Sequence, residues 1–215
     1  MRIWRCKAPL GGKAGKRPPR PAGGAGRARR LTLAAVAALV LGGAGLLLDG
    51  VSHPGDGRIG GNFRLHADTG AMVSPASFGG RYLLIYFGYT HCADVCPTTL
   101  AAMTAAMDRL GAAGARIQPL FITVDPTRDT PAVLRRYLAA FGDKVLGLTG
   151  NAGEIAAVER AYHVSASIQP GQDGHYSIEH SSVLMLTAPD GRFLAPIRAD
   201  ASPAVIAATL SRYLS

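Results

Sequence analysis

The sequence predicts an α/β domain, with a central mixed sheet flanked by helices, behind one N-terminal transmembrane helix. Three observations lead to this prediction. Two apolar, β-rich runs at residues 82–87 and 116–124 are each followed by a segment of helical character. A turn at residues 189–191, Pro-Asp-Gly, separates two further strand-like runs and predicts a hairpin. Eighteen uncharged and mostly apolar residues, 31–48, follow a basic leader.

The basic leader and the apolar run predict a membrane anchor. The first 48 residues hold ten of the 23 lysines and arginines and none of the 14 acidic residues. About 20 apolar residues cross a hydrocarbon core of ~30 Å, so residues 31–48 form a short but adequate span. The excess of positive charge before the span predicts a cytoplasmic N-terminus. Because Leu46–Leu48 ends the run without a small-x-small site, we expect an uncleaved anchor rather than a cleaved signal peptide.

These features divide the chain into four parts. We expect a basic cytoplasmic tail at residues 1–30, the transmembrane anchor at 31–48, a flexible Gly-rich tether at 49–61 and a folded domain at 62–215. The formal charge of +9 belongs to the leader, because the remaining thirteen basic residues are balanced by the 14 acidic ones. The high isoelectric point therefore does not indicate a nucleic-acid partner.

The elements of the folded domain follow in an informative order. We expect strands at residues 82–87, 116–124, 145–148, 182–187 and 192–197, and helices at residues 97–110, 131–141, 152–161 and 203–214. Pro97 would stand at the first helical position, where its missing N–H costs nothing, and Thr130 is the expected N-cap of the second helix. Two β–α units, then a hairpin and a helix, are typical of a thioredoxin-like fold. The polar residues 165–179 would form an inserted loop or hairpin before the C-terminal strands.

Cys92 and Cys96 lie between the first long strand and the helix that follows it, within Gly-Tyr-Thr-His-Cys-Ala-Asp-Val-Cys-Pro at residues 88–97. Four-residue spacing brings two sulfurs onto one face of a helical turn, with Cβ atoms roughly 5–6 Å apart. At a helix N-terminus we expect such thiols to ionise more readily than a free cysteine, whose pKa is roughly 8.5. The pair can close a disulfide or bind a soft metal ion. The third cysteine, Cys6, lies in the cytoplasmic tail.

Four motifs resemble the Sco/SenC family over roughly residues 58–214. They are the Cys motif at residues 88–97, Val-Asp-Pro-Thr-Arg-Asp-Thr at 124–130, Glu-His-Ser at 179–181 and Pro-Asp-Gly at 189–191. Ala93 departs from the family pattern, which usually has Pro there. The resemblance implies a thioredoxin fold and a membrane-anchored copper chaperone that helps assemble cytochrome c oxidase. It also implies that Cys92, Cys96 and His180 are the copper ligands.

The chemistry of those three residues agrees with this implication. Thiolate and imidazole donors suit copper, and both Cu(I) and Cu(II) accept such a set. Structural zinc takes four ligands, and no third cysteine follows the anchor. We expect His91, beside Cys92, to support the site rather than bind the metal. Of the other histidines, only His175 has a conceivable accessory role in copper transfer; His53, His66 and His163 lack a paired donor.

Two acidic segments remain near the cysteines. Asp94 either complements the helix dipole or steers a metal-bearing partner and tunes the thiols, and the sequence leaves both roles open. Residues 125–130 could cap the second helix and form a local ion pair between Arg128 and Asp125 or Asp129. The resemblance suggests that this segment shapes the rim of the site, and we expect no catalytic role for it.

Two functions follow from these predictions. The first is a metallochaperone, not an enzyme, that receives copper from an upstream donor protein and passes it to the CuA-bearing subunit of cytochrome c oxidase by ligand exchange. The alternative is a thiol–disulfide oxidoreductase that keeps a target's cysteines reduced and needs only Cys92 and Cys96. A peroxidase is disfavoured, because Tyr89 and Ala93 occupy the Pro and Thr places of the peroxiredoxin pattern counted back from Cys96.

The composition also suggests a location. Heavy use of Ala, Gly and Arg is typical of bacteria with GC-rich genomes, which predicts a single-pass protein of the bacterial inner membrane with its domain in the periplasm. The alternative is the mitochondrial inner membrane, facing the intermembrane space, because acid-free leaders rich in Arg occur there too.

Overall fold

The computed structural model describes residues 59–171 and 175–214. The predicted tail, the anchor at residues 31–48 and all but the last residues of the tether lie outside this part of the chain. Within the described ranges, no helix is long and apolar enough to cross a membrane.

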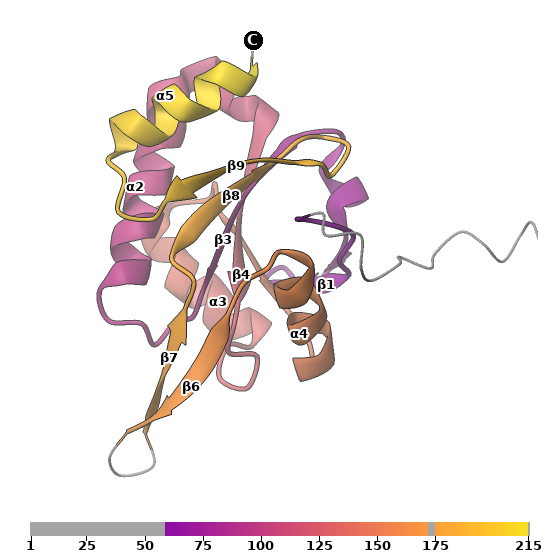
Figure 1. Cartoon of the computed structure of the whole chain (residues 1–215), viewed down its shortest axis with the longest axis vertical. Helices are drawn as coiled ribbons and strands as arrows, with labels where there is room; N and C mark the ends of the chain where they lie inside the picture. Colours follow the sequence, from indigo (N-terminus) through magenta and orange to yellow (C-terminus); the bar gives the residue numbers. More distant parts are fainter. Residues whose placement is uncertain (1–58, 172–174, 215) are drawn as a thin grey trace, which may run out of the picture. The chain divides into compact units, whose positions relative to one another are not determined.

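A seven-stranded mixed sheet forms the centre of the domain (Figure 1). Its strand order is β2-β1-β5-β4-β3-β8-β9. The three central strands β5, β4 and β3 are parallel to one another. β1 and β8 pair antiparallel with β5 and β3, and the edge strands β2 and β9 pair antiparallel with β1 and β8. The strands are β1 (Leu65–Ala67), β2 (Met72–Val73), β3 (Tyr82–Gly88), β4 (Ile117–Thr123), β5 (Leu146–Thr149), β8 (Val183–Thr187) and β9 (Phe193–Arg198).

Helices cover both faces of this sheet. The central strand β3 therefore buries its side chains on both sides. Leu84 and Tyr86 pack into one hydrophobic cluster with α2 (Val95–Leu110), α3 (Pro131–Leu138) and α5 (Pro203–Leu214). Ile85 and Phe87 pack into a second cluster with α4 (Ala152–Ala161) on the opposite face. Each fully buried large apolar side chain contributes about 1.5–3 kcal/mol to stability. The mixed sheet flanked by helices confirms the predicted α/β class.

Three short 3-10 helices complete the main body: η1 (Pro75–Phe78), η2 (Gly111–Arg116) and η3 (Ala139–Phe141). The predicted cap of α3 is confirmed, since the Thr130 side chain accepts a hydrogen bond from the Val133 N–H at 3.4 Å. The predicted helix 131–141 ends earlier than expected, because its last three residues tighten into η3.

The predicted place of Pro97 is wrong. α2 begins two residues earlier, at Val95, so Pro97 is the third helical residue rather than the first. The first four N–H groups of a helix have no partner within the helix, so a proline is tolerated at this position too. The earlier start brings Cys96 into the first turn of the helix.

The polar stretch before β8 forms a hairpin rather than a loop. β6 (Ala166–Pro170) and β7 (Tyr176–His180) pair antiparallel with Ala166 opposite His180, as a two-stranded sheet separate from the main one. The hairpin extends beyond the lower end of the main sheet in Figure 1. Most of its side chains are exposed, so its strands lack the apolar signature that marks β3 and β4.

Candidate metal centre

The Cys loop lies at the carboxyl edge of the central parallel strands. β3 ends at Gly88 and α2 begins at Val95, so the loop between them crosses this edge, where sites in α/β folds gather. A Cβ at Gly88 would lie 2.7 Å from the Phe121 ring and 3.0 Å from Cys96 Sγ. Only glycine therefore allows the loop to leave the sheet so close to the buried sulfur.

Three donor atoms converge above this edge. Cys92 Sγ, Cys96 Sγ and a ring nitrogen of His180 all lie within 4.8 Å of one another. Cys96 Sγ is 3.6 Å from His180 Nε2, and the Cys96 backbone N–H donates to Cys92 Sγ at 3.3 Å. The histidine comes from the end of β7, 84 residues after Cys96 in the chain. The predicted meeting of two sulfurs and a distant imidazole is confirmed.

The surroundings of His180 suit a metal ligand. Its Nδ1 lies 3.1 Å from the Ser181 carbonyl oxygen, and a proton donated there leaves Nε2 with a lone pair that faces the sulfurs. The rings of Tyr86 and Tyr89 stand edge-on to the imidazole, with centroids 6.3 and 5.9 Å away. Burial lowers the pKa of His180 below its usual value, which favours the neutral form that can bind a metal.

Cys96 differs from the sequence-based expectation. Both cysteines are free thiols, but Cys96 is fully buried whereas Cys92 is partly exposed. Burial, and then the hydrogen bond with Cys92, raise the pKa of Cys96 to about 12. The prediction of easy ionisation is therefore wrong for Cys96, because loss of water around the sulfur outweighs the favourable end of the helix dipole. Tyr86, which the sequence did not single out, donates a hydrogen bond to Cys96 Sγ at 3.7 Å.

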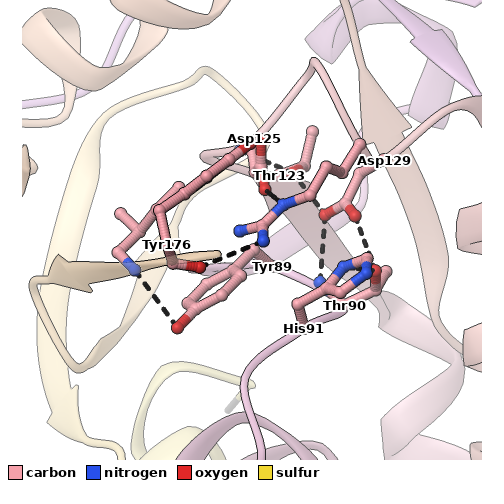
Figure 2. A network of polar contacts seen from close by, with 9 residues as sticks. Tyr89, Thr90, His91, Thr123, Asp125, Asp129 and Tyr176 are labelled. Atoms are coloured by element: carbon pink, nitrogen blue, oxygen red, sulfur yellow. Dashed lines mark hydrogen bonds and ion pairs between the residues drawn. The ribbon is translucent and has the colours of Figure 1, made fainter. Parts of the chain in front are cut away.

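A polar network, drawn in Figure 2, borders the site through Tyr89, whose ring stands edge-on to the His180 imidazole. We call it the rim network; its members are Tyr89, Thr90, Thr123, Asp125, Arg128, Asp129 and Tyr176. The predicted Arg128–Asp125 ion pair is present, and the Arg128–Asp129 alternative is not among the ion pairs of the described residues. Tyr89 and Tyr176 are rim residues that sequence reasoning missed, because the side chains of the buried Tyr89 and the half-buried Tyr176 contact segments distant in the sequence, which no local pattern reports.

The remaining predicted residues are not part of the three-donor cluster. His66, His163 and His175 are exposed, and none belongs to a cluster of metal-binding side chains in the described ranges; His53 lies outside those ranges. His91 is exposed too, with its Nδ1 3.2 Å from the Thr90 hydroxyl. Asp94 stands at the N-cap of α2, but its side chain makes no capping hydrogen bond. His180 is thus the one histidine of the described ranges that belongs to a cluster of potential metal ligands.

A family comparison agrees with this arrangement. The family described as SCO1/SenC matches residues 51–215. The chain belongs to this family. Among SCO relatives, the human protein SCO1 homolog, mitochondrial, is 37% identical over 165 residues, which are 75% of this chain and 55% of the human protein. A SCO2-like protein of Rickettsia felis is 40% identical over 148 residues, 68% of this chain and 72% of that protein. The chain spans about half the length of several SCO relatives that it matches.

Solved Sco structures share the fold. The structure of Bradyrhizobium japonicum ScoI with copper bound has a TM-score of 0.67 and 41% identity, and the match covers 72% of this chain and 99% of that one. Yeast Sco1 with copper bound has a TM-score of 0.65 and 33% identity, with 73% and 88% covered. The mixed sheet with flanking helices is thus the thioredoxin-like arrangement of Sco proteins, as the sequence predicted.

Proposed function

We propose that this chain binds copper through Cys92, Cys96 and His180. The single observation that carries the proposal is the convergence of two thiols and one imidazole within 4.8 Å at an edge of the sheet. Two soft sulfur donors and a neutral imidazole form a set that copper accepts, whereas structural zinc takes four ligands. The copper-bound structures of Bradyrhizobium japonicum ScoI and yeast Sco1 give independent support.

The site is suited to delivery rather than to permanent storage. Cys92 is partly exposed, while Cys96 is buried beneath it, so an incoming ligand can approach the ion from the side of Cys92. Three ligands leave a position open for that incoming donor. We infer that copper is a cargo, received from an upstream donor protein and passed by ligand exchange to the CuA-bearing subunit of cytochrome c oxidase.

The chain would work beside a membrane. The four-part map stays the same: a basic cytoplasmic tail at residues 1–30, an anchor at 31–48, a tether at 49–61 and the copper-binding domain at 62–215. This map rests on the apolar run and the charge distribution of the sequence. It places the domain outside the cytoplasm, in the periplasm of a bacterium or, alternatively, in the mitochondrial intermembrane space.

A second function is favoured by the state of the two cysteines. Both are free thiols near the start of α2, with Cys92 in the preceding loop and Cys96 in the first turn, and the partly exposed Cys92 can attack a disulfide while Cys96 resolves the mixed disulfide. The electrons for such a reduction come from the two thiols, which become a disulfide. This reaction does not use His180.

Replacing His180 separates the two functions. His180→Ala removes the imidazole but leaves both sulfurs. We expect copper(I) affinity to fall by more than about 100-fold, because losing a ligand costs more than the 10–100-fold typical of losing a residue that only orients a ligand. Disulfide exchange should be nearly unchanged. A competition titration with a chromophoric copper(I) chelator measures the affinity. His175→Ala is the matched control, because this exposed histidine lies near the start of β7 and outside the donor cluster.

The outcome decides between the functions. Unchanged affinity in His180→Ala would rule out the three-ligand site. If cells carrying His180→Ala still matured their oxidase while cells carrying Cys92→Ser did not, the oxidoreductase would be the better description.

A further inference from the structure

The donors of the site come from two parts of the fold that are attached differently. Cys92 lies in the loop between β3 and α2 and Cys96 in α2, whereas His180 belongs to β7 of the hairpin, whose strands pair only with each other. The distance between sulfurs and imidazole therefore depends on whatever joins the hairpin to the main body. Pairing within the hairpin alone cannot hold His180 in place.

Ile178 packs into the second hydrophobic cluster, and Arg128 adds several polar and aromatic contacts between the hairpin and the main body. Arg128 Nε donates to Asp125 Oδ2, and Arg128 Nη1 donates to the carbonyl oxygen of Tyr176, the first residue of β7, at 3.1 Å. The guanidinium also lies over the Tyr176 ring, 3.6 Å from its centroid, and 5.7 Å from the centroid of the Tyr89 ring. One planar cation thus meets a carboxylate, a carbonyl and two aromatic faces, a combination that lysine cannot reproduce.

Two tyrosine hydroxyls add to the attachment. Tyr176 donates its hydroxyl proton to Asp125 Oδ1 at 2.9 Å, and the Ile178 N–H donates to the Tyr89 hydroxyl at 3.2 Å. Ile178 is two residues before His180 on the same strand, and the Tyr89 ring also stands edge-on to the His180 imidazole. The Arg128 contacts and these hydroxyl bonds therefore reach β7 at its first and third residues.

Asp129, the residue after Arg128, contacts the loop that carries Cys92. Asp129 is fully buried and accepts hydrogen bonds from the Thr90 N–H at 3.0 Å, the Thr90 hydroxyl at 2.6 Å and the Thr123 hydroxyl at 2.7 Å. Thr90 is two residues before Cys92. Adjacent residues of one short segment thus contact the Cys loop on one side and the hairpin on the other (Figure 2).

The Arg128 side chain is largely buried, so its charge depends on the groups around it. Asp125 is only 3% exposed and the Arg128 side chain only 21%, and Arg128 Nη2 is buried without a hydrogen-bond partner among the described atoms. A charge buried in this way is costly unless ion pairing and hydrogen bonds compensate it. Moving the hairpin away from Arg128 would remove the carbonyl and the ring that provide part of that compensation. The hairpin and Arg128 therefore stabilise each other's placement.

From these contacts we propose that Arg128 is a positioning residue that holds β7 so that the His180 imidazole stays beside the two cysteines. The proposal deepens the proposed copper site and rests on it for the role of His180. Arg128 itself touches no ion. Its effect on copper passes through His180, and this gives a test that a general loss of stability cannot imitate.

The first experiment is a double-mutant cycle on copper(I) affinity with wild type, Arg128→Gln, His180→Ala and the double variant. Arg128→Gln should weaken binding by about 10–100-fold, as is usual for a residue that orients a ligand. In the His180→Ala background, Arg128→Gln should alter affinity by no more than about twofold, because there is no imidazole left to position. Twofold is about the deviation from additivity found for independent substitutions. An equal loss in both backgrounds, or no loss in the first, would overturn the proposal.

The second experiment needs no metal. Amide hydrogen exchange of the metal-free protein, followed by NMR, should show faster exchange for Ile178 and its β7 neighbours in Arg128→Gln and unchanged exchange in β3. Arg192→Gln is the matched control, because it removes an exposed arginine paired with Asp190 in the turn between β8 and β9. Unchanged exchange in β7, or an equal increase in β3, would contradict the proposal.

The two experiments fail in distinguishable ways. A wild-type protein without copper(I) affinity would disprove the proposed function, while the exchange of β7 would still test the attachment of the hairpin. Should Arg128→Gln not fold, Tyr176→Phe removes a single hydrogen bond to Asp125 and should give the same pattern with a smaller change. Tyr176→Phe exchange rates equal to wild type throughout β7 would then count against the proposal.

Discussion

The two cysteines and the histidine lie in regions that are packed very differently. Cys96 is part of the core: its side chain is fully buried, and a Cβ at Gly88 would lie only 3.0 Å from its sulfur. The hairpin is a separate two-stranded sheet whose residue Ile168 is 65% exposed. The Cys96 sulfur is therefore held by the core, whereas the hairpin is held by Ile178, which packs into the second cluster, and by the polar contacts of Arg128 and Tyr176.

The largest difference between the two regions should appear in stability. Gly88→Ala places a methyl group 2.7 Å from the Phe121 ring, and overpacking of this kind typically costs about 1–3 kcal/mol. Ile168→Ser in the hairpin removes an exposed side chain and should change stability by less than about 0.5 kcal/mol. Urea denaturation of both variants measures the two values. A hairpin substitution as costly as the core one would show that both regions are equally packed.

The two cysteines should differ in reactivity as well. Cys96 is buried with a pKa raised to about 12, so at pH 8 it is almost entirely a thiol, whereas Cys92 is partly exposed. In the reduced, metal-free protein, iodoacetamide should therefore modify Cys92 first, and peptide mass spectrometry identifies the labelled residue. Equal labelling rates on the folded protein would mean that Cys96 is not held in the core.

The same pKa predicts how stability depends on pH. Above about pH 8.5 the unfolded chain loses the Cys96 proton, while the folded protein retains it up to about pH 12. The folded state then binds more protons than the unfolded state, so the stability from this group is complete below pH 8.5 and is lost as the pH rises. Denaturation of the metal-free protein at pH 8 and pH 10 checks the direction, with Cys96→Ser as the control that should lose this part of the dependence.

The smallest expected effect concerns Tyr86. Its hydroxyl donates to Cys96 Sγ at 3.7 Å and lowers the pKa of that thiol slightly against the larger effect of burial. Tyr86→Phe keeps the ring, so the core stays filled, and should slow alkylation of Cys96 at pH 10 by less than about tenfold, the upper range for one neutral hydrogen bond. Faster alkylation would mean that Tyr86 shields Cys96 rather than stabilising its thiolate.

The contrast between the regions also explains what the sequence could predict. β3 and β4 were predictable because strands buried on both faces read as continuous apolar runs, and Thr130 was predictable because caps are local. The strands of the hairpin were not located, because their exposed side chains carry no periodic signal. The strands β1 and β2 are too short to leave a pattern.

The site shows the same limits. Its three donors were identified from motifs and a family resemblance, and the structure brings them together. The pKa of Cys96 was predicted in the wrong direction, because depth below the surface depends on the whole fold rather than on position in a helix. The contacts of Arg128 with Tyr176 join residues 48 apart, and no local pattern reports a contact between segments so distant.

The most direct measurement is X-ray absorption spectroscopy of the copper(I)-loaded protein, with His180→Ala beside it. A site built from Cys92, Cys96 and His180 should give two sulfur neighbours and one nitrogen neighbour per copper, and the nitrogen should disappear in His180→Ala. Coordination by sulfur alone in the wild type, or a nitrogen neighbour that survives the loss of His180, would contradict the three-ligand site.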